Sequence, residues 1–516
     1  MGWPASPVRS DRLFVVTFGY VLVPNVIFAL GWLRPGWAVP VVAAVVACAL
    51  DVWRRSTTAS PALSPRAWIL VLAFAAFWAF AAGIGELNFQ TTDYLKHNVL
   101  FHDLVVERWP VVYRNPGPDG PILCYYIAYY LPASLLGKML GLKHVAAFSL
   151  GWALLGIGLA FAWVFRFGQP RGAIVLGAFT LIDGFCWLPG LPTLAQKLGL
   201  LGGAVDPEWW HTDRFVEHFW SFGASHTRLL FPSEPGALVW APQQTLGAWL
   251  ATACVLRTLL EDHPARHVVV VNAAVLLWSP LVGVGLVPFT AAACLRRPRS
   301  GFSWPNALGG AAVATPVGLY FQGHYPQQFF GLLMTGFSGV TDWLKYLLFL
   351  LLAVGVLWAP AWLIRRTYGV PALASWRILC LASLTLVIIT PVFLGNYNDW
   401  VMRVSSPSLF VLHLTLANTA VGLWNTVAPL KHRLAFILLL LLSAERSLKV
   451  YALAPFGRLG GQGIDTTIVT ARRYAETIAT LPGTRDFDFA GQYLGRPDSF
   501  FGRHLLKRAG RASEHP

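Results

Sequence analysis

Long apolar runs separated by short polar segments extend over most of the chain. A helix needs about 20 mostly apolar residues to cross the hydrocarbon core of a bilayer. Runs close to that length lie near residues 12–33, 36–53, 67–85, 121–141, 144–165, 172–189, 237–257, 306–321, 343–364, 377–394, 407–426 and 433–449. The pattern predicts an all-α, polytopic membrane protein with about 12 to 14 transmembrane helices and with interfacial helices in its external loops.

Two parts of the chain depart from this simple alternation. The run 267–295 is interrupted by "WSP" at 278–280, so it is either one tilted helix or a pair of short helices that enter and return. Hydropathy falls near residue 451, and 451–516 has the composition of a small soluble C-terminal tail. We therefore divide the chain into a transmembrane helical domain, 1–450, and this tail.

Composition agrees with a membrane protein. Hydrophobic residues make up 56% of the chain and charged residues only 12%, which excludes an ordinary cytosolic enzyme. The formal charge of +15 comes mostly from Arg and Lys between apolar runs, where these residues orient helices and contact anionic headgroups. We therefore expect a lipid bilayer and no nucleic acid as a partner. All six Cys lie inside or beside apolar runs, so we expect neither disulfides nor a metal–thiolate site.

Positive charge sets the expected orientation. Arg and Lys cluster before the first run and in the loops near 54–66, 365–377 and 431–433, which the positive-inside rule places in the cytoplasm. External loops are then expected at 86–120, 190–236, 322–342 and 395–406. Simple alternation of spans would instead put 190–236 inside. A re-entrant pair at 267–295, together with one earlier run that is not a full span, would put it outside with the other polar loops, and we favour this second interpretation.

The first external loop gathers many ionisable residues beside the membrane. Asp93, Lys96 and His97 share one side of a predicted helix, since residues three and four apart are neighbours. A carboxylate partly desolvated there would have a raised pKa and could act as a base, which makes Asp93 and Glu86 candidate catalytic residues. Lys96, His97 and Asp103 are candidates for binding substrate. The alternative is a solvated interfacial helix without chemistry.

The second polar loop, 190–236, combines acids and His with Trp and Phe. Glu208, His211 and His218 are candidates for holding a sugar, because its C–H faces pack on aromatic rings while its hydroxyls bond to carboxylates. The alternative is an interfacial loop rich in aromatic residues. Glu208 and His211 could also ligate a metal, but spacing fixes no third ligand, so the metal is unknown and a divalent cation is one candidate cofactor.

The third polar loop contains "NYNDWVMRVSSP", 396–407. Arg403 stands at the edge of a membrane helix near Asp399, and an Arg at that depth is costly unless it is paired. Either Asp399 pairs with it structurally, or Arg403 meets an anionic ligand. A lipid phosphate fits, since a guanidinium group can bind phosphate through two parallel hydrogen bonds.

Several segments together resemble a known superfamily. They are "GELNFQTTDYLKH" as an acidic external loop, "WPVVY…LCYYIAYYLPASLLGK" as the following loop and helix, and the C-terminal tail. This layout resembles the C-type (GT-C) superfamily of multi-pass membrane glycosyltransferases, which take sugars from polyprenyl-phosphate donors on the outer face. "SHTRLLF…LVWAPQQTLGAWL" and "NYNDWVMRVSSPSLF" are similar to segments of uncharacterised bacterial multi-pass membrane proteins. The resemblance implies Asp93 as the base and Arg403 as the residue that holds the donor phosphate.

Two classes of function remain in competition. The first is a glycosyltransferase of the bacterial inner membrane that moves a sugar from a polyprenyl-phosphate donor to a glycan or lipid acceptor of the cell envelope, on the periplasmic face. The second is a transporter or flippase of a lipid-linked or anionic solute. Transporters usually show internal repeats and ionisable residues at mid-membrane, whereas here no repeat is visible and Asp183 is the main such residue. A polysaccharide polymerase or ligase is chemically close to the first class.

Overall fold

We describe the fold from a computed structural model of the chain. It defines residues 11–56, 63–113, 120–191, 195, 210–212, 218–222, 227–325, 330–370, 376–395, 398–457, 464, 466–471 and 493–507. Helices make up 74% and strands 5% of these residues, so the predicted helical class is confirmed.

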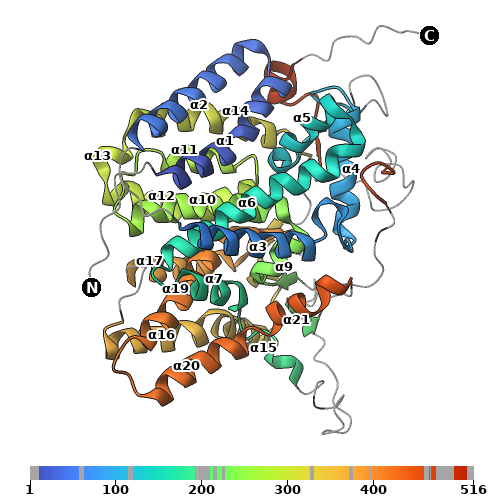
Figure 1. The fold of residues 1–516 in the computed structure, drawn as a ribbon. Helices are drawn as coiled ribbons and strands as arrows, with labels where there is room; N and C mark the ends of the chain where they lie inside the picture. Colours follow the sequence, from blue (N-terminus) through green and yellow to red (C-terminus); the bar gives the residue numbers. More distant parts are fainter. Residues whose placement is uncertain are drawn as a thin grey trace, which may run out of the picture.

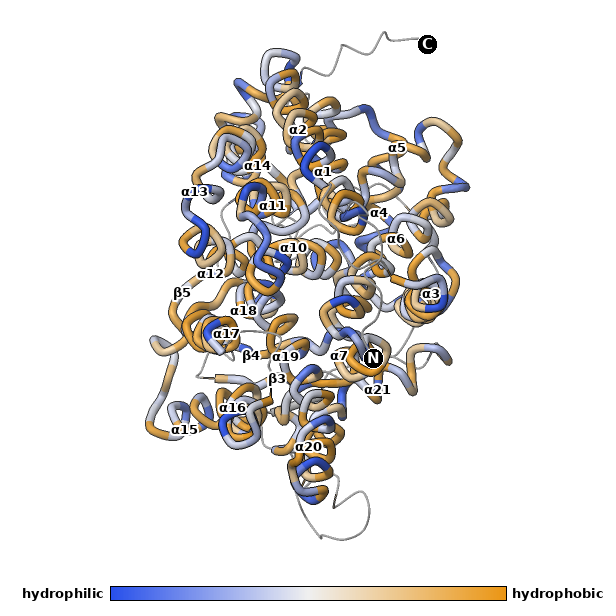
Figure 2. Tube along the Cα trace, turned by 60° about the vertical axis from the view of Figure 1, so that its left-hand side comes forward, coloured by the Kyte–Doolittle hydropathy of each residue, from blue (hydrophilic) through white to orange (hydrophobic). Residues whose placement is uncertain are grey.

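Five helical segments in the described part of the chain are long and apolar enough to cross a membrane, by length and composition. They are α1 (Arg12–Trp32), α2 (Pro35–Arg55), Leu142–Phe167 with α6 (Val145–Phe167), Val340–Tyr368 with α15 (Val340–Leu350) and α16 (Val356–Tyr368), and α19 (Ser406–Trp424). The shorter apolar helices are α3 (Pro65–Ala81), α5 (Leu131–Leu140), α7 (Gly172–Leu181), α12 (Pro280–Arg296) and α17 (Trp376–Ile389). Most of these helices are coloured as hydrophobic in Figure 2. The apolar helices indicate a membrane protein.

The predicted spans 121–141 and 237–257 are each divided in the structure. Residues 121–141 contain strand β1 (Ile122–Leu123), the 3₁₀ turn η2 (Ile127–Tyr129) and α5, so the prediction of one helix there was wrong. Hydropathy misled because it does not separate side chains buried in protein from side chains that face lipid. The span 237–257 is split between α9 (Glu234–Trp240) and α10 (Pro242–Leu260), where Pro242 has no N–H to continue the helix.

The run 267–295 forms two helices, which agrees with the prediction of a helix pair rather than one tilted helix. They are α11 (Val268–Val275) and α12, separated by "WSP". Ser279 caps α12, because its Oγ accepts from the backbone N–H of Val282 at 3.4 Å and Pro280 fills the first helical position.

The remaining elements connect these helices. The other α-helices are α4 (Asp93–Val106), α13 (Pro298–Gly301), α14 (Gly310–Gln322), α18 (Asp399–Val404), α20 (Leu430–Ser443) and α21 (Glu445–Leu453). The short 3₁₀ and π turns are η1 (Ile84–Glu86), η3 (Leu142–His144), η4 (Leu188–Gly190), η5 (Pro305–Gly309), η6 (Leu333–Gly336), η7 (Leu351–Gly355), η8 (Ala454–Phe456) and η9 (Phe501–Leu505).

Helix α10 lies at the centre of the helical body (Figure 1). It packs against α1, α6, α11, α12 and α19, and every residue from Pro242 to Leu259 is buried. Above it in Figure 1 lie α1, α2 and α14, while α15, α16 and α20 form the lower part. A helix that is buried on every side joins the two parts into one core.

The described residues form three small antiparallel sheets, two of which link segments far apart in the sequence. Strand β1 pairs with β7 (Leu494–Gly495), with Leu123 opposite Leu494. Strand β3 (His218–Phe222) pairs with β2 (Trp210–Thr212) and β4 (Thr227–Leu229). Strand β5 (Phe330–Leu332) pairs with β6 (Val392–Leu394) and so joins the third predicted external loop to the end of the predicted span 377–394.

The described parts of the predicted C-terminal tail pack against the helical body. The Arg34 Nε donates to the carbonyl oxygen of Leu506 at 3.0 Å. The ring of Phe501 lies 5.3 Å from that of Tyr320 and 6.3 Å from that of Phe28, measured between centroids. These segments are therefore part of the same core as the helices.

Candidate functional site

Helix α4 carries most of the residues that the sequence singled out, and neighbouring groups fix both of its ends. Asp93 occupies the first turn, where a carboxylate interacts favourably with the positive end of the helix dipole. At the other end, the Lys138 ammonium donates to the backbone carbonyls of Val105, at 2.9 Å, and Glu107. The carbonyl groups that a helix leaves without partners in its last turn are thus satisfied.

His97 points into the protein, and both of its ring nitrogens have partners. Nε2 lies 3.0 Å from the Trp240 carbonyl oxygen, which can only accept, so Nε2 carries the proton. Nδ1 then accepts from the Tyr130 hydroxyl at 2.5 Å. Burial lowers the pKa of His97 well below its usual value, and the charge of Lys96 adds to this effect. His97 is therefore a neutral residue of the core, with no nitrogen left for a substrate.

Lys96, the residue before His97 on α4, interacts with the charged residues of α18. Its Nζ is 5.9 Å from the centre of the Tyr125 ring. Burial acts to lower the pKa of Lys96, but electrostatic interactions with Tyr125 and Asp93 outweigh it, and the pKa is raised. Arg403 and Asp399 also interact electrostatically with Lys96. Charges from two loops about 300 residues apart therefore meet in one place.

The Asp399–Arg403 pair on α18 is loose. Arg403 Nε lies 3.6 Å from Asp399 Oδ1, which is too long for a hydrogen bond. The Arg403 side chain is only 12% exposed, whereas that of Asp399 is 41% exposed. Arg403 Nε is buried and has no hydrogen-bond partner within the described part of the chain. This guanidinium group has therefore lost water without gaining a full set of protein acceptors.

Asp93 and Lys96 are also left without direct partners. Neither side chain forms a hydrogen bond or an ion pair with another described residue, although both are only partly exposed. We use the name charge cluster for Asp93, Lys96, Asp399 and Arg403. Its two cations and two carboxylates could hold an anionic group and move a proton in the same place.

The segment before η2 brings Tyr125 to the charge cluster and is held by Tyr320 of α14. The Tyr320 hydroxyl accepts from the Tyr125 backbone N–H at 2.9 Å and lies 3.1 Å from the Leu123 carbonyl oxygen. The Tyr493 ring, next to β7, packs on Tyr125 with centroids 4.6 Å apart. The C-terminal strand therefore contributes to the wall of the site.

Glu86 and Asp103 form contacts that stabilise the fold. Glu86 Oε1 accepts from the Ile468 backbone N–H at 2.6 Å, and its own φ of 61° is unusual for a residue other than glycine. Asp103 is fully buried and accepts from the Tyr113 hydroxyl at 2.9 Å. Its other oxygen lies 3.2 Å from His102 Nδ1. Neither residue reaches the charge cluster through a described contact.

The second polar loop joins a different part of the molecule. His218 on β3 is buried, and its Nε2 lies 2.9 Å from Glu445 Oε2 at the start of α21. Burial lowers the pKa of His218, and the bond to Glu445 opposes this effect. Glu208 lies outside the described residues, and His211 is described only as part of strand β2.

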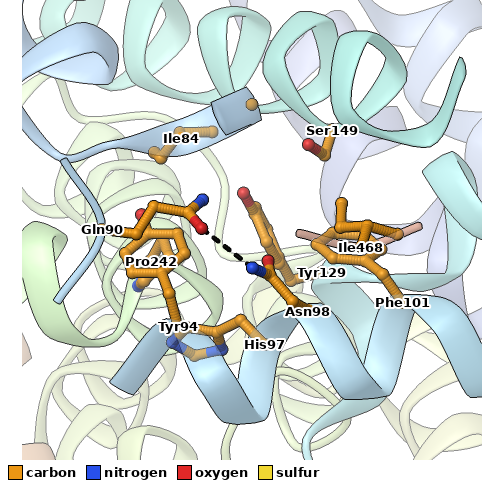
Figure 3. Close-up of a pocket in the computed structure, with 11 residues that line it drawn as sticks. Ile84, Gln90, Tyr94, His97, Asn98, Phe101, Tyr129, Ser149, Pro242 and Ile468 are labelled. Atoms are coloured by element: carbon orange, nitrogen blue, oxygen red, sulfur yellow. Dashed lines mark hydrogen bonds between the residues drawn. The ribbon is translucent and has the colours of Figure 1, made fainter. Parts of the chain in front are cut away.

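A small cavity with a mixed polar and apolar lining lies beside α4 (Figure 3). Its walls include Tyr94, His97 and Asn98 of α4, with Gln90, Ser149 and Ile468 around them. Asn98 Nδ2 donates to Gln90 Oε1 at 2.8 Å, drawn as a dashed line in Figure 3. The cavity has room for little more than a water molecule, so it is too small for a sugar.

Comparisons with known proteins add no assignment. No protein-family model matches the chain, and neither a curated protein nor a solved structure is similar to it. Within the described residues, no group of three or more His, Cys, Asp or Glu side chains is arranged to hold a metal ion. The argument for function rests on the geometry of the charge cluster.

Sequence reasoning missed the aromatic and amide residues that surround this cluster. Tyr125 and Tyr126 stack at 4.6 Å beside Lys96 and were counted as part of a membrane span. Gln243 Nε2 lies 3.4 Å from the Tyr125 hydroxyl, and Asn398 precedes α18. The only sequence signal for them was the unusual concentration of Tyr between 125 and 130 and of Asn between 396 and 398.

Proposed function

We propose that the protein is a membrane glycosyltransferase that moves a sugar from a polyprenyl-phosphate donor to a glycan or lipid acceptor of the cell envelope. The observation that carries the proposal is the meeting of Lys96 and Asp93 of α4 with Arg403 and Asp399 of α18. Such a reaction needs cations for the departing phosphate and a base for the acceptor hydroxyl. The charge cluster offers both beside apolar helices.

In this reaction the acceptor oxygen attacks the anomeric carbon of the sugar. A new carbon–oxygen bond forms as the bond from that carbon to the phosphate oxygen breaks, and the bonding electrons leave with the polyprenyl phosphate. Asp93 takes the acceptor's proton. Lys96 and Arg403 stabilise the negative charge that grows on the leaving phosphate, and Asp399 lies beside Arg403.

The proposal places the site on the periplasmic face of a bacterial inner membrane, following the distribution of Arg and Lys along the chain. Single-cysteine variants at positions 93 and 399, labelled in intact cells with an impermeant thiol reagent, test this arrangement. We expect both positions to label from outside. Labelling from opposite sides would contradict a single site.

A transfer assay tests the activity itself. Purified protein in phosphatidylcholine vesicles is supplied with polyprenyl-phosphate sugars and with membrane extract as the acceptor source. We expect release of polyprenyl phosphate and a labelled product, and both should be lost when Lys96 and Arg403 are replaced by Met. The proposal would be contradicted if the protein binds the polyprenyl-phosphate sugars but transfers none of them.

A second candidate, transport, has one observation in its favour. His413 lies in the apolar helix α19, where its Nδ1 is 3.0 Å from Glu234 Oε1, and both side chains are buried. Trp249 Nε1 donates to the other Glu234 oxygen at 2.6 Å. Ionisable residues inside a membrane often mark a solute path. Movement of a labelled polyprenyl-phosphate sugar between leaflets without sugar transfer would favour this candidate.

A further inference from the structure

The side chain of Asn398 is oriented by two hydrogen bonds at the start of α18. Its Oδ1 accepts from the backbone N–H of Leu394 at 3.3 Å and of Val401 at 3.4 Å. Because backbone N–H groups only donate, the amide oxygen must face them and the amide nitrogen must face away. The residue has a φ of 58°, a left-handed conformation that Asn adopts more readily than most residues, and it is fully buried.

The Nδ2 group of Asn398 has no acceptor. This nitrogen is buried and has no hydrogen-bond partner within the described residues, and the same holds for Arg403 Nε five positions later. A buried donor without an acceptor is costly, and native proteins keep few of them. Both donors belong to one short segment, so a single oxygen-bearing ligand could accept from both.

The nearest protein acceptor does not meet this need. The Asp399 carboxylate lies 3.6 Å from Arg403 Nε, too far for a hydrogen bond, and its side chain is 41% exposed, so water reaches it. A ligand that satisfies both donors needs several acceptor oxygens, and negative charge suits the guanidinium group and the nearby Lys96. A phosphate group has these properties.

We propose that Asn398 Nδ2 and Arg403 Nε bind two oxygens of one phosphate group, which makes Asn398 a second phosphate-binding residue on α18. This inference deepens the proposed transferase reaction, because that phosphate would be the one that leaves with the lipid. Binding does not require turnover, however. A protein that binds the phosphate but transfers no sugar would refute the transferase proposal alone.

The substitution Asn398→Asp tests the assignment without removing the cap of α18. Asp keeps an oxygen that can accept from Leu394 and Val401, and it tolerates the left-handed conformation. It replaces the amide donor by a second carboxylate oxygen, which repels phosphate. Asn425→Asp at the far end of α19 adds the same charge elsewhere and serves as the control.

Binding is measured on the full chain in phosphatidylcholine nanodiscs, with farnesyl phosphate, farnesol and inorganic phosphate as probes. We expect farnesyl phosphate to bind wild type and Asn425→Asp with equal affinity. Its affinity for Asn398→Asp should be lower by about tenfold or more. Farnesol, which lacks the phosphate, should not bind. Thermal unfolding of each variant confirms that it is folded.

The probes also separate the two sources of phosphate. Tighter binding of farnesyl phosphate than of inorganic phosphate upholds the site with a lipid as its ligand. Equal binding of the two upholds the phosphate site but assigns it to the free anion. Equal affinity of folded wild type and Asn398→Asp for farnesyl phosphate, or no binding of either phosphate by wild type, overturns the inference.

Discussion

Two of the protein's Asp–Arg pairs, Asp183–Arg446 and Asp399–Arg403, differ in almost every physical respect. The side chains of Asp183 and Arg446 are 4% and 2% exposed. Two guanidinium nitrogens of Arg446 donate to the two Asp183 oxygens: Nε to Oδ2 at 2.5 Å, and Nη2 to Oδ1. The remaining Arg446 nitrogen, Nη1, donates to the Phe231 carbonyl at 2.9 Å. Asp399 and Arg403 share one contact at 3.6 Å, and Arg403 Nε lacks a hydrogen bond among described residues.

The difference separates a structural pair from a binding pair. A buried pair with good geometry on every atom stabilises one conformation and has no capacity left for a ligand. A buried cation that lacks some of its hydrogen-bond acceptors can still bind a ligand. The same reasoning sets Lys96 apart from Lys138, whose ammonium is bonded to two carbonyl groups at the end of α4.

Breaking the two pairs should have very different effects on stability. Arg446→Met leaves a buried carboxylate without its partner, and we expect a loss of about 3–5 kcal/mol of unfolding free energy. Arg403→Met should cost about 1 kcal/mol or less, since Asp399 can be hydrated. Unfolding curves in detergent measure both. The double variant Asp183→Leu/Arg446→Met is the control, and it should regain most of the lost unfolding free energy. Similar losses of unfolding free energy in Arg446→Met and Arg403→Met would contradict the comparison.

The same comparison predicts how the guanidinium geometry affects ligand binding. Arg403→Lys keeps the charge but replaces the planar fork by a point charge, so affinity for farnesyl phosphate should fall about tenfold. Titration in nanodiscs measures it. Lys431→Arg, at a predicted cytoplasmic loop, is the conservative control and should leave the affinity unchanged. Unchanged binding in Arg403→Lys would indicate that Arg403 contributes charge alone.

A smaller effect concerns pH and the buried His97. Its pKa is lowered in the folded protein, mainly by burial, so the unfolded chain binds a proton more readily below about pH 6.5. Stability should therefore fall as the pH drops from 7.5 to 5, by at most about 1.4 kcal/mol per pH unit from this residue. His97→Gln should reduce this fall in melting temperature, whereas exposed His144→Gln should not. An identical fall in His97→Gln would contradict a neutral, buried His97.

Much of the helical body could be predicted from hydropathy, because α1, α2, α6 and α19 are long apolar runs without interruption. Residues 121–141 could not, since tyrosines buried against α14 and β7 look the same in sequence as tyrosines at a membrane interface. The pairing of Leu123 with Leu494 depends on a contact between segments 371 residues apart in the sequence (494 − 123). No local pattern encodes such a contact.

The candidate site was predictable in part. Asp93, Lys96, Asp399 and Arg403 were singled out because charge beside apolar runs is unusual, and the structure brings these four together. His97, Asp103 and His218 were chosen by the same rule, but each is paired within the core. Sequence alone gives no information on which side of a helix faces a partner.

The most direct test of the account is the transfer rate of Asp93→Asn, because Asn keeps the size of the side chain and removes the base. We expect turnover to fall by about 10²–10⁴-fold, with donor binding and melting temperature close to wild type. Glu107→Gln, at the C-terminal end of α4, is the matched control and should keep most of the activity. Transfer by folded Asp93→Asn at the wild-type rate would contradict the assignment of Asp93 as the base of this site.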